Sequence, residues 1–321
     1  MDSLTHGLLG LAIGSLRRPD GERNAVLVAC VLAAELPDLD YFVAASDPVL
    51  HALKAHRGLS HSLVAAPVVA LAAALLSKLL FRSARLSTVY LWSVPAALVG
   101  HLLADAWTGW GTRLFLPFSQ ARITLDWMLV VDPLFTAPLL VAALWGWRRR
   151  RVVPRALRWG LLLASLYLGL RVAAKSLLTA RVERFYPGAT LVQVFPSWFG
   201  PAHWRYVAVW PERYAVGKLS LLSGPTEQAR HTRSGLPALS ATAVSNPTVN
   251  EALAWARYPL VRERRVGQGG TQLAIADLRY HLNGQPTLTF VIELDARTRV
   301  VSATLERGGS ARSLLERFRA Q

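Results

Sequence analysis

Histidine and aspartate side chains recur at the ends of the apolar segments in the first half of this chain. Two of these clusters are pairs, His56 with His61 in the stretch HRGLSH and His101 with Asp105 in the stretch HLLAD. Imidazole and carboxylate groups together are typical ligands of Zn²⁺, and they also bind Mn²⁺ or Fe. Ionisable groups beside membrane segments are costly, so by default they indicate a function. The pairs therefore predict a divalent-metal site, most naturally a zinc site.

The spacing within each pair fits a shared metal ion. His101 and Asp105 are four residues apart, so on a helix they share one face, roughly 5–6 Å apart. His56 and His61 bracket a glycine-containing turn that lets both rings face the same point. Thiolate ligands are not part of the prediction, because the chain has one cysteine, Cys30, inside an apolar run.

Three further positions join the candidate metal site. His6 lies in the first apolar run, where a surface position or a helix cap is the alternative. Asp38 and Asp40 follow a proline in LPDLD, and in extended chain one carboxylate points inward; helix capping is the alternative for both. We assign Asp38 to the metal and Asp40 to a supporting catalytic role. The predicted ligands are His6, Asp38, His56, His61, His101 and Asp105.

Besides Asp40, two residues are expected to assist catalysis. Arg57 lies between the two histidines of its motif and can bind a phosphate group with its fork of donors. The alternative for Arg57 is that it reaches toward lipid headgroups. Asp126 and Asp132 flank the start of an apolar segment, where a helix N-terminus favours negative charge. Asp126 is taken as a catalytic candidate, and the role of Asp132 stays open.

Apolar segments position these side chains. Four of them approach the roughly 20 residues that a hydrocarbon layer of ~30 Å requires. They cover residues 61–81, 86–104, 128–147 and 156–174. Two shorter runs, 4–16 and 25–36, are expected to form a helical hairpin packed among them.

Basic residues predict the orientation of these segments. They concentrate in alternate turns, as Arg17, Arg18, Arg23, Lys78, Arg82, Arg85, Arg148, Arg149, Arg150, Arg151, Arg155 and Arg158. The positive-inside rule places these turns in the cytoplasm. Every candidate histidine and aspartate falls at the opposite end of its segment. We therefore expect a multi-pass protein with the metal site on the outer face of the membrane.

The composition favours lipid partners over nucleic acid. Hydrophobic residues make up 52% of the 321 residues and charged residues 17%, against roughly a quarter charged in soluble domains. A net charge of +16 would suit nucleic acid, but many arginines flank apolar runs, where they contact anionic lipids. We expect membrane lipids and a small-molecule or lipid substrate as partners, and no nucleic acid.

The sequence changes character near residue 175. Short alternating runs bounded by Gly, Pro or Asn predict strands at 190–195, 204–210, 213–221, 272–280, 287–294 and 299–305. Residues 249–258 predict a short helix, and 222–247 a loop. The expected fold is an all-α helical membrane bundle over 1–175, followed by a small, mainly antiparallel α+β soluble domain over 176–321. The side of the membrane that this domain occupies is left open.

The motifs together resemble a known family. They are MDSLTH (1–6), LPDLD (36–40), HRGLSHS (56–62), HLLAD (101–105), WTGWGT (107–112), LPFS (116–119), LDW (125–127), DPLFT (132–136), FPS (195–197) and HWRY (203–206). In this order, over most of residues 1–210, they resemble the bacterial inner-membrane metal-dependent hydrolases, which include LexA-regulated members. The resemblance implies an inner-membrane location and a hydrolase site. A likeness to zinc-dependent phospholipase C, inferred for that family, implies phosphoester substrates.

Together these features predict a membrane-bound hydrolase in which metal-activated water attacks a phosphoester or lipid-like substrate. The alternative is a non-enzymatic metal protein, either a transporter or a stress-response factor with a structural metal. A transporter places its ligands near the bilayer midplane, and a structural site is fully ligated. The candidates here lie near one membrane end and outnumber the ligands of a closed tetrahedral site, which favours the hydrolase.

Overall fold

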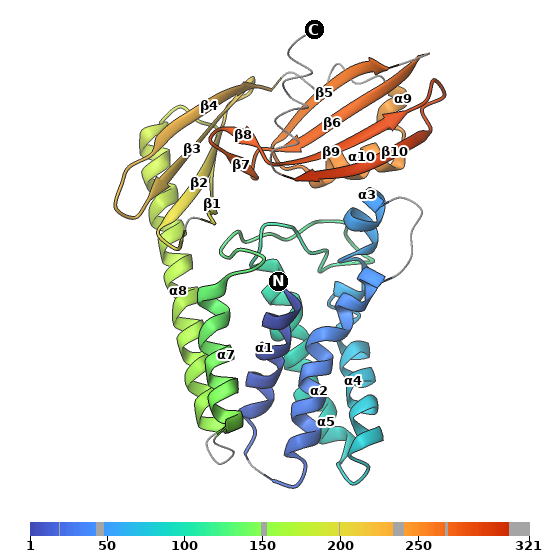
Figure 1. The fold of residues 1–321 in the computed structure, drawn as a ribbon, viewed down its shortest axis with the longest axis vertical. Helices are drawn as coiled ribbons and strands as arrows, with labels where there is room; N and C mark the ends of the chain where they lie inside the picture. Colours follow the sequence, from blue (N-terminus) through green and yellow to red (C-terminus); the bar gives the residue numbers. More distant parts are fainter. Residues whose placement is uncertain are drawn as a thin grey trace. The chain divides into compact units, whose positions relative to one another are not determined.

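The chain divides into two compact units, a helical unit and a sheet unit (Figure 1). The computed structural model describes residues 1–18, 20–42, 48–148, 153–198, 200–233, 241–266 and 269–307. The helical unit comprises Met1–Val43 and His56–Ala173, and the sheet unit comprises Ala44–Ala55 and Ala174–Gln321. Helices followed by mainly antiparallel strands confirm the expected fold class.

The helical unit begins with two short helices and ends in a long one. Its elements are α1 (Ser3–Ser15), α2 (Arg23–Glu35), the 3-10 helices η1 (Leu36–Phe42) and η3 (Leu59–His61), α4 (Ala66–Leu80), α5 (Leu86–Pro95), the π-helix η4 (Ala96–Leu103), α6 (Ala104–Ala106) and α7 (Pro133–Arg148). The last element is α8 (Val153–Phe185), which belongs to the helical unit as far as Ala173. The expected hairpin of two short helices is present, since α1 packs against α2.

Two helices begin later than the apolar runs predicted. The run from residue 61 becomes helical only at Ala66, and Pro67 lies in the first turn of α4. The run from residue 128 becomes helical at Pro133, whose missing N–H costs nothing at a helix start. The carbonyl of Asp132 accepts bonds from the amides of Phe135 and Thr136 and so closes the first turn of α7.

Two described helical stretches are long and apolar enough to cross a membrane, Leu86–Ala106 and Arg155–Phe185. A third is added if the bent pair His51–His61 and Ala66–Leu80 counts as one span. Large apolar side chains of these helices are exposed, including Leu79 on α4 and Leu166 on α8. Exposed leucines on long apolar helices suit contact with lipid.

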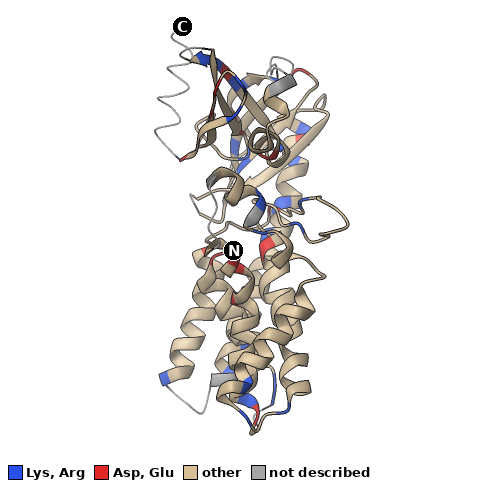
Figure 2. Cartoon of the chain, turned by 90° about the vertical axis from the view of Figure 1, so that its right-hand side faces the viewer, with Lys and Arg blue, Asp and Glu red and all other residues tan. Residues whose placement is uncertain are grey.

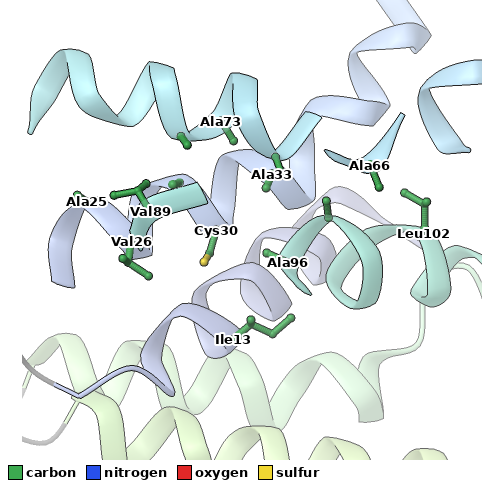
Figure 3. Packing of buried hydrophobic residues seen from close by; sticks show 14 of the residues in the cluster. Ile13, Ala25, Val26, Cys30, Ala33, Ala66, Ala73, Val89, Ala96 and Leu102 are labelled. Atoms are coloured by element: carbon green, nitrogen blue, oxygen red, sulfur yellow. The ribbon is translucent and has the colours of Figure 1, made fainter. Parts of the chain in front are cut away.

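Small side chains let the helices of the first unit approach closely (Figure 3). The cluster between α1, α2, α4 and α5 consists largely of alanines, such as Ala29, Ala33 and Ala73, all fully buried. At Gly10 the fit is tightest: a Cβ there would lie 2.5 Å from the carbonyl oxygen of Cys30. Close backbone approach through small residues is typical of helices that pack within membranes.

The sheet unit contains two four-stranded antiparallel sheets. The first has the order β1 (Leu191–Pro196), β2 (His203–Val209), β3 (Arg213–Ser220), β4 (Thr226–Thr232), and the second β10 (Val300–Arg307), β9 (Leu288–Leu294), β6 (Gly270–Asp277), β5 (Pro259–Val266). A two-stranded ribbon, β7 (His281–Leu282) with β8 (Gln285–Pro286), and the helices α3 (Pro48–Leu50), η2 (His51–Ala55), α9 (Ala241–Val244) and α10 (Pro247–Trp255) complete the unit.

Four strands were not expected from the sequence: the two-residue strands β7 and β8, and the longer strands β4 and β5. β4 lies inside the predicted loop 222–247, and β5 follows α10 directly. Both are edge strands with many polar residues, reading TEQARHT and PLVRERRV. Charged side chains protect sheet edges from unwanted pairing, and they also hide the alternating pattern that identifies a strand. The region 249–258 was predicted as a helix, and α10 covers most of it.

The close contact at Gly10 yields a stability prediction. We expect Gly10→Ala to lower the unfolding free energy by about 1–3 kcal/mol, because the added methyl meets a backbone carbonyl that cannot move aside. Gly169→Ala on the exposed face of α8 is the control, since a Cβ there meets nothing within 4 Å. Thermal unfolding in detergent measures both, and equal midpoints for Gly10→Ala and wild type would contradict this packing.

Candidate metal centre

Four buried or half-buried side chains converge in the helical unit: Asp38, His61, His101 and Asp105. Each offers a ligand atom, and these atoms all lie within 4.8 Å of one another. They come from three separate parts of the sequence: η1, η3, and the continuous stretch of η4 and α6. Two imidazoles and two carboxylates at this spacing form a donor set that Zn²⁺, Mn²⁺ or Fe can use.

Local irregularities of the helices place these residues. Pro37 follows the last residues of α2, and the chain tightens into η1, which carries Asp38. Pro95 is the last residue of α5, and beyond it the helix widens into the π-helix η4, which carries His101. Short π-helical stretches occur often at functional sites. The two predicted helix partners, His101 and Asp105, thus reach the centre from one continuous stretch, with His101 Nε2 4.0 Å from Asp105 Oδ2.

Backbone carbonyls fix the tautomer of two histidines. His101 Nδ1 lies 2.6 Å from the carbonyl oxygen of Ala34, and His6 Nδ1 lies 2.8 Å from that of Gly100. A carbonyl oxygen can only accept a hydrogen bond, so each Nδ1 carries the proton. In a neutral ring the Nε2 atom then holds a lone pair, which is the form that binds a metal ion.

The Nε2 atoms face carboxylates across short gaps. His61 Nε2 lies 3.3 Å from Asp38 Oδ1 and 3.5 Å from Asp105 Oδ2, while His6 Nε2 lies 3.3 Å from Asp105 Oδ1. Three buried atoms here lack a hydrogen-bond partner: the Nε2 atoms of His6 and His101 and the Oδ2 atom of Asp105. Lone pairs that face lone pairs in a buried place are costly. A cation among them would satisfy all three, so the residues fit a metal ion.

Asp40 connects the centre to its surroundings. Its carboxylate lies 3.1 Å from His61 Nδ1 and 2.9 Å from His56 Nδ1, and it accepts a bond from Ser60 Oγ at 2.5 Å. Burial alone would raise the pKa of the Asp40 carboxyl, but the hydrogen bonds with the two histidines and Ser60 hold it below its ordinary value. A carboxylate behind a histidine ring orients that ring toward a metal and strengthens it as a ligand.

Arg57 is buried beside the centre and is 4% exposed. Its Nη2 atom lies 2.9 Å from Asp105 Oδ1, and its Nη1 atom donates to Thr108 Oγ1 at 3.3 Å. The amino group of Met1 contacts the same Asp105 oxygen. Oδ1 thus contacts the two cationic groups and His6, and Oδ2 faces His61 and His101. The backbone of Arg57 is left-handed, with φ 61°, which non-glycine residues seldom adopt away from functional sites.

Other predicted residues lie outside the four-residue cluster. His6 borders it and stacks on His101, with ring centroids 4.1 Å apart. His56 is tied to Asp40 through Nδ1. Asp126 is buried, with φ 53°, in a segment whose neighbours bond to the end of α6. Asp132 starts α7 and accepts from Tyr167 Oη at 3.1 Å.

A cavity of about 520 Å³ adjoins the cluster. Asp38 belongs to both, so the ligand set borders an accessible space. Leu39, Tyr41 and Phe42 also line the cavity and are more than half exposed. Glu35 lines it as well; neither Glu35 nor Ser60 was among the predicted site residues, although both lie within or next to the motifs that carry the ligands.

Lysine and arginine residues gather in the loops at the end of the helical unit that lies away from the N-terminus (Figure 2). The loops that follow α1 and precede α5 meet through ion pairs of Glu22 with Arg17 and Arg85. The candidate ligands lie at the other ends of α1 and α2, each a 13-residue helix, which corresponds to about 20 Å. The basic turns and the metal candidates thus occupy opposite ends, as the sequence predicted.

Comparison with known proteins identifies the family of this region. The family model of the YdjM inner membrane protein matches residues 1–178. The chain belongs to the YdjM inner membrane protein family. Every predicted site residue falls inside the matched range, and most of the sheet unit falls outside it. Membership confirms the resemblance to a bacterial inner-membrane family that the motifs indicated.

A similar protein is the uncharacterized protein YfhP of Bacillus subtilis (strain 168). The two are 26% identical over 153 residues, which is 45% of this chain. The chain thus spans about half the length of this relative, 46% of it. No solved structure matches the chain.

The bond between Asp40 and His61 yields a prediction on metal affinity. We expect Asp40→Asn to weaken metal binding about 10–100-fold, the usual cost of losing the carboxylate behind a ligand histidine. Competition with a chromophoric chelator on the detergent-purified protein measures the affinity. Asp20→Asn, an exposed position at the basic end, is the control and should bind as wild type does. Unchanged affinity in Asp40→Asn would show that Asp40 does not support the ligand.

Proposed function

We propose that this protein is a membrane-bound metal-dependent hydrolase that acts on a phosphoester, most naturally within a lipid. The single observation that carries the proposal is the position of Asp38. It belongs to the cluster of four ligand residues and also lines the adjoining cavity. A ligand set that borders a cavity has room for water and substrate, which a closed structural site lacks.

The residues around the cluster supply the rest of the reaction. A divalent ion held by Asp38, His61, His101 and Asp105, with His6 beside them, would supply Lewis-acid chemistry and lower the pKa of a water molecule. Asp40 holds the ring of His61 in place. Arg57, buried beside Asp105, would provide the positive potential that an anionic phosphoester requires.

The cavity lining supports a lipid-like substrate. Leu39, Tyr41 and Phe42 expose apolar surface where the chain leaves α2, and Phe42 is 77% exposed. An apolar rim beside a polar ligand set matches a molecule with an acyl part and an anionic headgroup. Membership of an inner-membrane family and helices long enough to span put such molecules within reach.

The distribution of charge supports a location at the outer face. The basic loops beside Glu22 lie at the opposite end of α1 and α2 from the ligands, and basic loops stay in the cytoplasm. The metal centre of a multi-pass inner-membrane protein would then open toward the outer leaflet.

One observation favours a second function, a structural metal site. Four ligand residues are enough to fill a tetrahedral site, and three of them are fully buried. In that case the ion would stabilise the junction of α2, η3 and η4 without turnover. Activity measurements on metal-loaded protein separate the two functions.

Hydrolysis is tested with phosphoesters and His variants. Zn²⁺- or Mn²⁺-loaded protein in mixed micelles should hydrolyse bis-p-nitrophenyl phosphate or phospholipid headgroup esters. We expect His61→Ala and His101→Ala to lower the rate at least about 100-fold, since the metal contributes several kcal/mol to such reactions. His203→Ala, an exposed histidine of the sheet unit, should retain full activity.

Two results would reject the enzymatic proposal. One is stoichiometric metal without hydrolysis of any tested phosphoester, which would leave the structural role. The other is hydrolysis that persists in both His61→Ala and His101→Ala, which would show a contaminating enzyme.

The orientation is tested by cysteine labelling in the Cys30→Ala background. Ser119→Cys lies in the turn 105–127 and Ser83→Cys in the basic loop before α5, and both positions are exposed. A membrane-impermeant maleimide should label Ser119→Cys on intact spheroplasts and Ser83→Cys only after lysis. The reverse pattern would place the metal centre on the cytoplasmic face.

A further inference from the structure

The sheet unit contains a second cavity, of about 440 Å³. It is lined by residues of β2, β3, β4 and β7 and of the turns beside them, all within the sheet unit. This part of the chain lies almost wholly beyond the range that the family model matches, so the family description does not account for it.

Two cations meet at this cavity without a matching acid. Arg205 on β2 is the direct cross-strand partner of Lys218 on β3, so both side chains lie on the same face of the sheet. Like charges in directly opposed positions are destabilising. No acidic residue lines the cavity, and no ion pair joins either cation to a carboxylate in the described ranges. The nearby acid Glu227 is bonded to Tyr186 and Arg230 instead.

Backbone carbonyls hold the guanidinium of Arg205 in position. Its Nη1 atom donates to the carbonyl of His281 at 3.2 Å, and its Nη2 atom donates to that of Pro196 at 3.0 Å. These bonds fix the group but leave its charge unneutralised, and its buried Nε–H has no partner. Burial lowers the pKa of Arg205 to about 10, so the group remains charged at neutral pH.

His281 adds a buried polar group to the same cavity. It is 1% exposed, and neither of its ring nitrogens makes a hydrogen bond of normal geometry, although the backbone of Tyr206 lies beside the ring. Burial, and after it the charge of Arg205, lowers the pKa of His281 to about 3, so the ring is neutral and offers one N–H. A buried imidazole without a normal hydrogen bond is costly unless something occupies the cavity that it lines.

We propose that this cavity binds a small molecule bearing an oxyanion, a phosphate or a carboxylate. Arg205 and Lys218 supply the positive charge, and His281, Ser220 and Thr226 line the same space. Lysine and arginine with hydroxyl donors are a common way to hold such groups. This site is independent of the metal centre and of the hydrolase proposed for it.

Titration of the full-length protein in detergent with inorganic phosphate and, separately, with citrate tests the proposal. Isothermal calorimetry should detect binding of at least one of the two, which also distinguishes phosphate from carboxylate. Lys218→Met should weaken binding about tenfold or more, the usual effect of losing one charged hydrogen bond. Lys218→Arg should retain most of the affinity, because it keeps the charge.

A matched control uses the same strand. Arg213 on β3 is exposed and lies over the ring of Trp210, away from the cavity lining, so Arg213→Met should bind as wild type does. Three results would overturn the proposal: no binding of either anion, equal weakening in Arg213→Met, or binding that survives Lys218→Met and disappears in His101→Ala. The second would show a diffuse basic surface, and the third would assign the anion to the metal centre.

Discussion

Hydrogen bonds from histidine rings to backbone carbonyls govern the arrangement of the helical unit. His101 binds the carbonyl of Ala34, and His6 binds that of Gly100. These bonds join α1, α2 and η4, and they fix a proton on each Nδ1 atom, so that Nε2 of a neutral ring carries the lone pair. The Nε2 atoms face Asp105 in a fully buried place. The cost of burying such lone pairs against a carboxylate is what a bound cation removes.

The packing around these bonds depends on side-chain size. A ring can reach a carbonyl on the next helix only if the helices lie close together, and residues such as Gly10 and Ala33 permit this. The carbonyl of Ala34 is available because Pro37 and the turn into η1 end α2 just beyond it. The positions of the ligand atoms therefore depend both on how closely the helices pack and on where α2 ends. A change in either would move the Nε2 atoms.

Much of the centre could be predicted from residue types and spacing. The four-residue interval between His101 and Asp105 and the position of Asp38 after a proline were enough to select them. The different environments of His56 and His61 could not be predicted, because the sequence treats them alike. In the structure a left-handed residue follows His56, whose ring bonds to Asp40, whereas His61 reaches the other ligands.

The same contrast holds for the fold. Apolar runs predicted the helices of the helical unit, because burial in lipid requires an apolar composition that can be recognised in the sequence. Strands β4 and β5 could not be predicted from the sequence. An edge strand needs only its backbone and a few buried contacts, so its side chains resemble those of a loop. The cavity beside Lys218 could not be predicted from the sequence either, because it depends on the register of β2 against β3.

The most direct test is the metal content of the detergent-purified protein after loading with Zn²⁺ or Mn²⁺, measured by mass spectrometry for wild type, His101→Ala and His203→Ala. The account predicts stoichiometric metal in wild type and in His203→Ala, and its loss in His101→Ala. Wild-type protein that holds no metal after loading would contradict the central claim, because the buried lone pairs would then have to be satisfied in another way.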